Sequence, residues 1–202
     1  MSRTIDVPPE RLGRWIEGFA ERHGGIAERR PGETGLTMVG QDGALAVVEP
    51  PFPPIRGDLV EHALRARAVG AILLRLGGYA VGEFVGTQLV ASKCGSRLVH
   101  GRNKAGGQSQ RRFARRREKQ AREAVEAAVN TVQRVLTPVA ARLDAVVTGG
   151  DRAALRQLWQ DPRLTHLHEL TVTRVYEVPE PRWSVLTAFP SLYRRVDITL
   201  DP

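Results

Sequence analysis

Apolar residues near the start of the chain recur at the spacing of an amphipathic helix. The stripe within residues 8–23 consists of Leu12, Trp15, Ile16 and Phe19. Prolines in the opening turn and the Gly24-Gly25 pair that follows are typical helix boundaries. We therefore predict a helix over residues 8–23, with Trp15 in the core rather than exposed as a stacking platform for a nucleic-acid base.

The rest of the apolar pattern predicts strands separated by turns and helices. The expected strands cover residues 26–28, 36–39, 44–49, 69–76, 79–85, 88–94, 146–148, 169–176 and 196–200. The expected further helices cover residues 58–68, 109–136, 151–159 and 183–189. Hairpins and crossovers in one chain imply an α+β (α/β-like) fold, a single domain over residues 1–202 with a mixed β-sheet flanked by helices. Residues 31–202 would form the core, and residues 1–30 an additional N-terminal helix and strand.

The helix expected over residues 109–136 is the longest, and its two halves differ. The first half consists almost entirely of Arg, Lys and Gln, and Ser109 is a good N-cap candidate. The second half carries an apolar stripe made of Ala121, Ala124, Val125, Ala128, Val132 and Val135. We expect the apolar half to pack on the sheet and the basic half to project the preceding loop.

Positive charge is concentrated around that loop. The 202-residue chain has a formal net charge of +8. From Lys93 to Arg122 it has eleven Lys or Arg against one acid, Glu118, a local charge of +10 that leaves −2 for the remainder. Such a field concentrates polyanions, which favours a phosphate-rich, anionic partner. A basic helix face that is merely solvated is the alternative.

Other features of the sequence favour a cytoplasmic protein. Its single cysteine, Cys94, excludes a disulfide framework and a Cys-rich zinc site. The N-terminus lacks the apolar core of a signal peptide, and no apolar run approaches the length of a membrane span. We expect a cytoplasmic monomer with no membrane association, cofactor or metal.

The loop contains the motif Gly106-Gly107-Gln108. Glycine has no Cβ, so Gly106 and Gly107 let the backbone come very close to another molecule. The helix that follows begins with backbone N–H groups that have no intrahelical partner. Gln108 therefore presents a neutral amide and a backbone N–H at a narrow tip.

No nucleophile and base accompany this tip. His166 and His168, read as alternate residues of a strand, could ligate a metal, but no third ligand stands near them. Lys93 could lower the pKa of the Cys94 thiol, although a buried or incidental cysteine is the better interpretation. The tip would act by positioning water and stabilising charge inside the active site of another molecule.

These residues resemble a known family. The His100-Gly101 pair, the Gly106–Ser109 motif and the Arg112–Arg115 run (Arg-Phe-Ala-Arg) resemble the catalytic domain of eukaryotic and archaeal class I peptide chain release factors. The resemblance extends to residues 69–84 and 143–151, and together it covers roughly residues 40–200.

The departures from that family are informative. At 202 residues, the chain is expected to contain neither a stop-codon-reading domain nor a domain that recruits a GTPase. It therefore resembles the stand-alone Vms-like release factors of ribosome rescue, and its high Arg, Ala, Gly and Val content suits an actinobacterial member. The family's loop is slightly shorter, and Asn103 and Lys104 look like the extra length.

The resemblance implies a peptidyl-tRNA hydrolase that acts on stalled large ribosomal subunits, with peptidyl-tRNA and rRNA as partners. The catalytic residues would be Gly106, Gly107 and Gln108. The residues that hold rRNA or tRNA phosphates would be Arg102, Lys104, Arg111, Arg112, Arg115, Arg116 and Lys119. Phe113 would pack in the core or stack on a base.

Two other functions are compatible with the same residues. The tip could promote cleavage of the tRNA acceptor strand, which would make the protein an endonuclease on the same complexes. Alternatively, the basic helix could bind rRNA without catalysis, in which case Gln108 would be dispensable.

Overall fold

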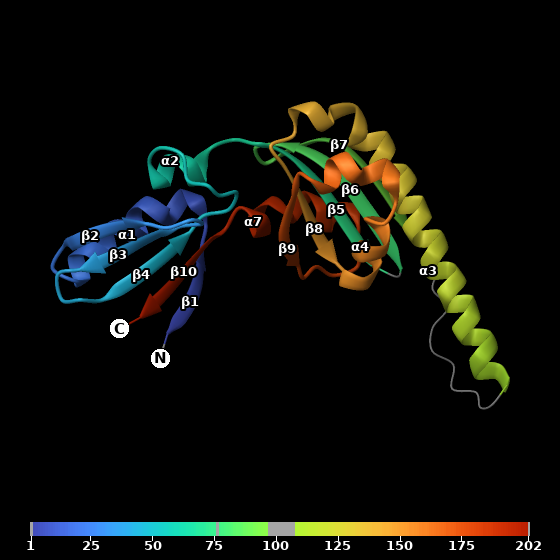
Figure 1. The fold of residues 1–202 in the computed structure, drawn as a ribbon, viewed down its shortest axis with the longest axis horizontal. Coiled ribbons are helices and arrows are strands. Elements are labelled where there is room, and N and C mark those ends of the chain that lie inside the picture. The colour runs from blue at the N-terminus through green and yellow to red at the C-terminus, as the bar shows by residue number, and fades with distance from the viewer. Residues whose placement is uncertain (1, 76, 97–107, 202) are drawn as a thin grey trace. The chain divides into compact units, whose positions relative to one another are not determined.

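The computed structural model describes residues 2–75, 77–96 and 108–201, and for residues 108–118, 120 and 121 it describes the backbone alone. The chain forms two compact units. The N-terminal unit comprises Met1–Arg65 and Pro190–Pro202, and the second unit comprises Ala66–Phe189. Each unit contains one five-stranded sheet with helices packed against it (Figure 1).

The N-terminal unit is built on an antiparallel sheet with the strand order β1-β10-β4-β3-β2. Its strands are β1 (Arg3–Val7), β2 (Ile26–Pro31), β3 (Leu36–Gly40), β4 (Leu45–Glu49) and β10 (Val196–Asp201). Its helices are α1 (Pro9–Arg22), α2 (Leu59–Leu64) and α7 (Pro190–Tyr193). The last strand of the chain lies between β1 and β4, so both chain ends belong to one sheet.

One face of this sheet is covered by α1. Leu12 and Phe19 of α1 pack with Met38 and Val48 of the sheet, and all four side chains are buried. Trp15 is half-buried against this core and stacks on Phe19, with ring centroids 5.7 Å apart. The prediction that Trp15 belongs to the core is therefore confirmed.

The second unit contains a mixed sheet with the strand order β7-β6-β5-β8-β9. Its strands are β5 (Ala68–Arg75), β6 (Gly78–Val85), β7 (Gln88–Ser96), β8 (Ala145–Gly150) and β9 (Thr171–Tyr176). Strands β5, β6 and β7 form an antiparallel meander, whereas β8 runs parallel to both β5 and β9.

Helices cover both faces of this second sheet. They are α3 (Gln108–Val135), the 3-10 helix η1 (Thr137–Arg142), α4 (Arg152–Leu158), the 3-10 helix η2 (Pro162–Leu164), α5 (Thr165–His168) and α6 (Trp183–Ala188). On one face, Val132 of α3 and Leu155 of α4 share a core with Ile72 and Leu74 of β5. On the other face, α6 comes so close to β6 that a Cβ on Gly82 would lie 3.0 Å from Leu186.

The predicted α+β class is confirmed, and the predicted helices and strands are present with ends shifted by a few residues. Other details differ from the predictions. The strands form two sheets rather than one, and α3 begins at Gln108, so Ser109 lies inside the first turn instead of capping it. The sequence analysis also did not predict β1, α5, α7 or the two 3-10 helices. Within the described residues, no helix is long and apolar enough to span a membrane.

Candidate functional site

The predicted site residues fall into two groups. The first group lies outside the described residues and consists of Arg102, Lys104, Gly106 and Gly107. The second group lies in the N-terminal half of α3 and consists of Gln108, Arg111, Arg112, Arg115, Arg116 and Lys119. Because Gln108 is the first residue of α3, its backbone N–H is one of those that have no acceptor within the helix.

Lys119 is the RNA-binding candidate whose side chain the structure describes. Its side chain is 76% exposed, and its ammonium nitrogen lies 3.9 Å from the Glu123 carboxylate one turn further along. An exposed pair of this kind contributes only about 0.3–0.5 kcal/mol. Lys119 can therefore exchange Glu123 for a phosphate group at little cost.

The C-terminal half of α3 is anchored by the apolar stripe predicted from the sequence. Ala128 and Val132 are fully buried against the sheet in the core that contains Ile72. Just after the helix, a Cβ on Gly70 of β5 would lie 3.0 Å from Leu136, so glycine lets the chain come close to the strand. The N-terminal half of α3 extends beyond the end of the sheet (Figure 1). One helix thus has a buried base and a projecting end.

A polar contact also ties the base of α3 to the sheet. The buried Thr131 hydroxyl lies 3.2 Å from the phenol oxygen of Tyr79 on β6, within hydrogen-bonding distance. The Tyr79 ring lies over Gly95 of β7, where an added Cβ would overlap the ring. Tyr79 therefore joins α3 to β7, the strand from which the chain enters the Gly-Gly-Gln loop.

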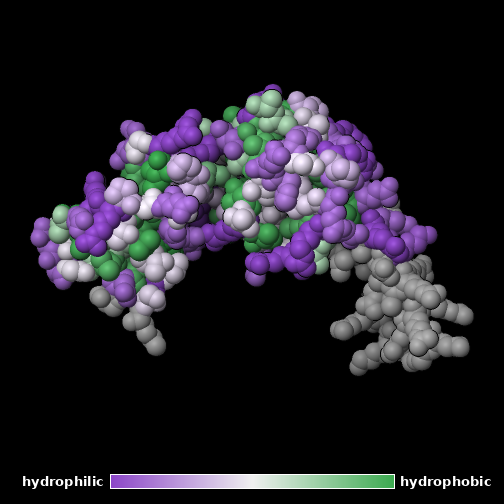
Figure 2. Space-filling model, in the orientation of Figure 1, coloured by the Kyte–Doolittle hydropathy of each residue, from purple (hydrophilic) through white to green (hydrophobic). Residues whose placement is uncertain are grey.

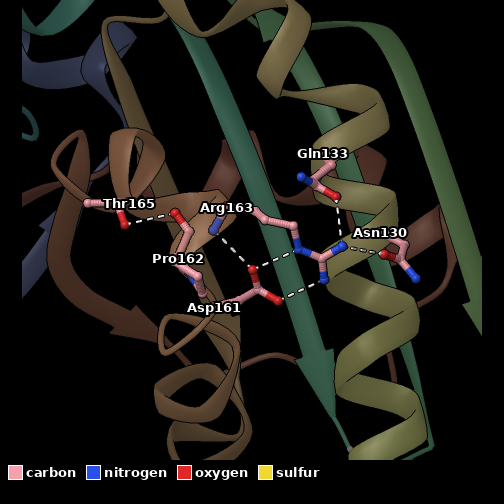
Figure 3. Close-up of polar contacts among 6 residues, drawn as sticks. All are labelled: Asn130, Gln133, Asp161, Pro162, Arg163 and Thr165. Carbon is pink, nitrogen blue, oxygen red and sulfur yellow. Dashed lines mark hydrogen bonds and ion pairs between the residues drawn. The ribbon is translucent and has the colours of Figure 1, made fainter.

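Arg163 connects η2 to α3: its guanidinium donates four hydrogen bonds, two of which reach α3 (Figure 3). The other two form a fork on the Asp161 carboxylate, with Nε 2.8 Å from Oδ1 and Nη2 2.7 Å from Oδ2. The Nη1 atom donates to the side-chain oxygens of Asn130 and Gln133 on α3, each at 3.1 Å. Planar, bidentate pairing of this kind fixes the guanidinium in one orientation. We refer to Asp161, Arg163, Asn130 and Gln133 as the arginine clamp.

The clamp is held in its charged form. The side-chain hydrogen bond from Arg163 lowers the pKa of the Asp161 carboxyl, and the backbone N–H of Arg163 adds to the effect. The same hydrogen bond raises the pKa of the Arg163 guanidinium. The ion pair is therefore present throughout the neutral range.

Charge divides sharply between the two units. The second unit contains twenty Lys and Arg against ten Asp and Glu, whereas the N-terminal unit contains ten against twelve. Hydrophilic residues cover the visible, described part of α3 (Figure 2). The excess of positive charge therefore belongs to the second unit.

The other chemical candidates are not brought into a site. His166 and His168 lie on α5 rather than on a strand, and the His168 ring packs on Trp159 with centroids 5.0 Å apart. No group of three potential metal ligands occurs among the residues that the structure describes. Burial raises the pKa of the Cys94 thiol, and the opposing effect of Lys93 is smaller, so the suggestion that Lys93 activates this cysteine is wrong.

Sequence reasoning missed the polar contacts that fasten α3. The Asp161-Pro162 pair is a helix-start signature and could have located η2, because Asp161 accepts a hydrogen bond from the Arg163 backbone at 3.0 Å. Asn130 and Gln133 stand three residues apart, which places them on one side of the helix. No pattern in the sequence around Asn130 and Gln133 indicates that they contact Arg163.

The family model described as Actinobacteria/chloroflexi VLRF1 release factor matches residues 67–199. A crystal structure of the archaeal translation termination factor aRF1 has 14% identity and a TM-score of 0.44, with 96% of this chain and 67% of that chain covered. A structure titled "Archaeal protein" has 16% identity and a TM-score of 0.41, with 96% and 66% covered. A search of curated proteins found no match.

Proposed function

The chain belongs to the Actinobacteria/chloroflexi VLRF1 release factor family, and from this premise we propose that it hydrolyses the ester of peptidyl-tRNA on stalled large ribosomal subunits. The observation that carries the proposal is the position of Gly106-Gly107-Gln108. The motif ends on the first residue of α3 and lies inside the most basic segment of the chain. A tip of this composition can enter a site lined with RNA.

The proposed chemistry is attack of water on the ester carbonyl. The water oxygen bonds to the carbonyl carbon, the bond to the tRNA ribose oxygen breaks, and the proton passes to that ribose oxygen. Negative charge develops on the carbonyl oxygen in between. The Gln108 backbone N–H would donate a hydrogen bond to it, and one such donor is typically worth about 2.7–4 kcal/mol. The Gln108 side chain would orient the water, so the protein needs no general base of its own.

Binding would depend on the basic residues around the tip. Arg102, Lys104, Arg111, Arg112, Arg115, Arg116 and Lys119 would contact rRNA or tRNA phosphates. Each phosphate contact that is removed should lower the slope of log Kd against log salt by roughly 0.7–0.9. Replacement of Arg112 by alanine should therefore weaken subunit binding most at low salt.

The C-terminal half of α3, which packs on the sheet, would hold the tip in a fixed position. A helix of 28 residues is roughly 40 Å long. A small sideways shift near its C-terminal end therefore moves Gln108, at the other end, over a distance several times larger. The Tyr79–Thr131 contact and the arginine clamp oppose such a shift. Hydrolysis depends on donor placement to within a fraction of an ångström, so these contacts support the catalytic interpretation.

The test uses purified large subunits that carry a labelled peptidyl-tRNA. We expect the wild-type protein to release peptide from intact tRNA. Gln108→Ala keeps the backbone N–H but removes the side chain that orients the water, so we expect it to lower the rate of release by roughly 10²-fold, the cost of misplacing a reacting group. Gln110→Ala is the matched control, since it removes the same side chain two residues further into the helix. Gly107→Val tests the backbone separately, because a β-branched side chain prevents close approach.

Analysis of the tRNA 3′ end separates the alternatives. A peptide that stays joined to a short nucleotide stub would identify an endonuclease. Binding without either product, and unaffected by Gln108→Ala, would identify a non-catalytic rRNA-binding factor. Either result would overturn the hydrolase assignment.

A further inference from the structure

Strand β7 is an end strand of the second sheet, with one edge that β6 does not cover. The strand order is β7-β6-β5-β8-β9, so within residues 2–75, 77–96 and 108–201 no strand other than β6 pairs with β7. The strand is nine residues long, from Gln88 to Ser96. An end strand directs a row of backbone N–H and C=O groups away from the sheet. The outer edge of β7 can therefore bind an extended molecule.

The side chains of β7 include hydrogen-bond donors and one cation but no acid. Gln88, Ser92, Lys93 and Ser96 are exposed, and Lys93 is the charged residue of the strand. The absence of Asp and Glu from the sequence extends from Gly86 to Arg117, a stretch that contains nine Lys and Arg. Strand β7 therefore continues the basic segment that contains Gly-Gly-Gln.

The register of the sheet places Lys93 on the face that α3 covers. Lys93 stands opposite Val81 of β6, and Val81 is buried in the core that contains Val132 of α3. Side chains directly opposite each other in an antiparallel pair project from the same face. Lys93 and α3 therefore lie on one side of the sheet.

The basic half of α3 leaves the sheet at the end where β7 finishes. Leu136, just after the helix, lies against Gly70 near the start of β5, whereas Thr131, earlier in the helix, contacts Tyr79. Tyr79 stands opposite Leu74, near the end of β5. Followed towards its N-terminus, α3 therefore runs towards the end of β5. Strand β7 finishes at that same end, because β5 and β7 are both antiparallel to β6 (Figure 1).

An RNA in contact with the basic half of α3 could also reach the edge of β7. Lys93 stands three residues before Ser96, the last residue of the strand, which is a distance of about 10 Å along a strand. Phosphate oxygens accept hydrogen bonds from an ammonium group and from backbone N–H groups. Ribose 2′-hydroxyls can donate to backbone C=O groups. RNA therefore offers a partner for every kind of group on this edge.

A second polypeptide strand fits the edge less well. A lysine on an end strand and a β-bulge both oppose the addition of another strand, and β7 has both. The cation is Lys93, and the register shifts where β7 pairs with Glu83 and Phe84. A second copy of the chain would also bring two acid-free, basic segments together, which costs electrostatic repulsion.

We propose that the outer edge of β7 is a second RNA-binding surface, on which Lys93 contacts a phosphate of the large-subunit rRNA. The inference rests on the proposed ribosomal function and adds a contact to it. The rRNA would then be held on two sides of the Gly-Gly-Gln loop, by the strand that precedes the loop and by the helix that follows it.

The test measures binding of the full chain to bacterial large subunits, and separately to their protein-free rRNA, over a series of salt concentrations. Lys93→Gln removes one positive charge from the edge, and the matched control Arg156→Gln removes one from an exposed position of α4. We expect Lys93→Gln to lower the slope of log Kd against log salt by roughly 0.7–0.9 on both targets. Arg156→Gln should leave the slope unchanged, and Lys93→Arg, which keeps the charge, should retain the wild-type slope.

Three outcomes would overturn the proposal. The first is an equal slope for Lys93→Gln and Arg156→Gln. The second is a loss that also occurs in Lys93→Arg, because the contact would then not depend on charge. The third is a change on subunits that is absent on protein-free rRNA, because a ribosomal protein would then occupy the edge.

A photocrosslinker identifies the occupant directly. Cys94 is the single cysteine of the chain, so Cys94→Ser combined with Ser92→Cys places one thiol at an exposed position of β7. A benzophenone attached to that thiol should crosslink to rRNA when the protein is bound to large subunits. A crosslink to a ribosomal protein or to a second copy of the chain would reject RNA as the occupant.

The proposed function is decided by other measurements. Peptide release at saturating protein tests the hydrolase, and the salt dependence of Arg112→Ala tests the basic half of α3. If both results are as expected while Lys93→Gln behaves like its control, the surface on β7 alone is rejected.

Discussion

Tyr79 and Thr131 meet at the base of α3, where their hydroxyl oxygens lie 3.2 Å apart between β6 and the helix. Thr131 is 2% exposed, and its hydroxyl is also 2.9 Å from the Ala127 carbonyl oxygen one turn earlier. The contact thus links the internal hydrogen bonding of the helix to the sheet. It is the point from which the projecting half of α3 is held.

Removal of the Tyr79 hydroxyl should loosen that point. We expect Tyr79→Phe to lower the free energy of unfolding by about 0.5–1.5 kcal/mol, the net value of one hydrogen bond. Denaturant unfolding measures the change. Thr131→Val and the double variant Tyr79→Phe/Thr131→Val complete a double-mutant cycle. A coupling energy near zero between the two positions would show that the 3.2 Å contact does not hold the helix.

Arg142 and Glu83 form a second link in the same unit. The Glu83 side chain is 2% exposed, and its Oε1 accepts hydrogen bonds from Nε and Nη2 of Arg142 at 2.9 and 2.5 Å. Arg142→Ala would leave the carboxylate buried without its cation, so we expect a loss of about 3 kcal/mol in the free energy of unfolding. Glu83→Gln should cost less, because an amide is cheaper to bury than a charge. Thermal unfolding of both variants tests the order, and a smaller loss for Arg142→Ala than for Glu83→Gln would contradict it.

The arginine clamp should weaken in acid. The pKa of Asp161 is lowered in the folded protein, chiefly by the side-chain hydrogen bond from Arg163. A depressed carboxyl pKa contributes stability above the pKa of the unfolded chain and loses it as the pH falls through the folded value. Hydrogen exchange in the segment of α3 around Asn130 should therefore accelerate as the pH falls below the ordinary Asp range, after correction for intrinsic rates.

A pair of variants isolates the clamp from general acid effects. Arg163→Ala should show fast exchange in this segment already at neutral pH, with little further change in acid. Arg156→Ala, an exposed arginine on α4, should behave like the wild type. If the acid response persists in Arg163→Ala, other carboxyl groups cause it.

The periodic parts of the fold could be predicted from the sequence, and the long-range pairings could not. Leu12 and Phe19 lie at helical spacing, so α1 is recognisable from local pattern alone. Strand β1 has no such signal: it is five residues long, and its partner across the sheet, as in Ile5 opposite Ile198, lies at the other end of the chain. The division into two sheets follows from that pairing, which no local pattern encodes.

The candidate site shows the same division. Gly106-Gly107-Gln108 is contiguous, so the motif and its surrounding charge are visible in the sequence. The contacts that hold its helix join residues far apart, such as Tyr79 with Thr131 and Asn130 with Arg163. Ser109 was predicted as the cap from its residue type, but a helix start one residue earlier places it in the first turn.

Cys94 on the edge strand β7 allows a test of the environment beside the loop. Desolvation raises the pKa of its thiol, and the Lys93 ammonium offsets this only in part. Because the thiolate is the nucleophile, alkylation by iodoacetamide should be slower at neutral pH in the folded protein than in the denatured chain. The rate should rise with pH to an inflection above the ordinary cysteine value of about 8.5.

Lys93→Ala removes the opposing charge, so the inflection should move still higher in that variant. The raised thiol pKa also affects stability. The contribution of the protonated thiol to the free energy of unfolding is fully present below the pKa of the unfolded chain, and it is lost as the pH rises through the pKa of the folded protein. An inflection below that of the denatured chain would contradict both statements, and would mean that the positive field of the loop outweighs desolvation at Cys94. That result would extend the positive field around the loop as far as Cys94, near the C-terminal end of β7.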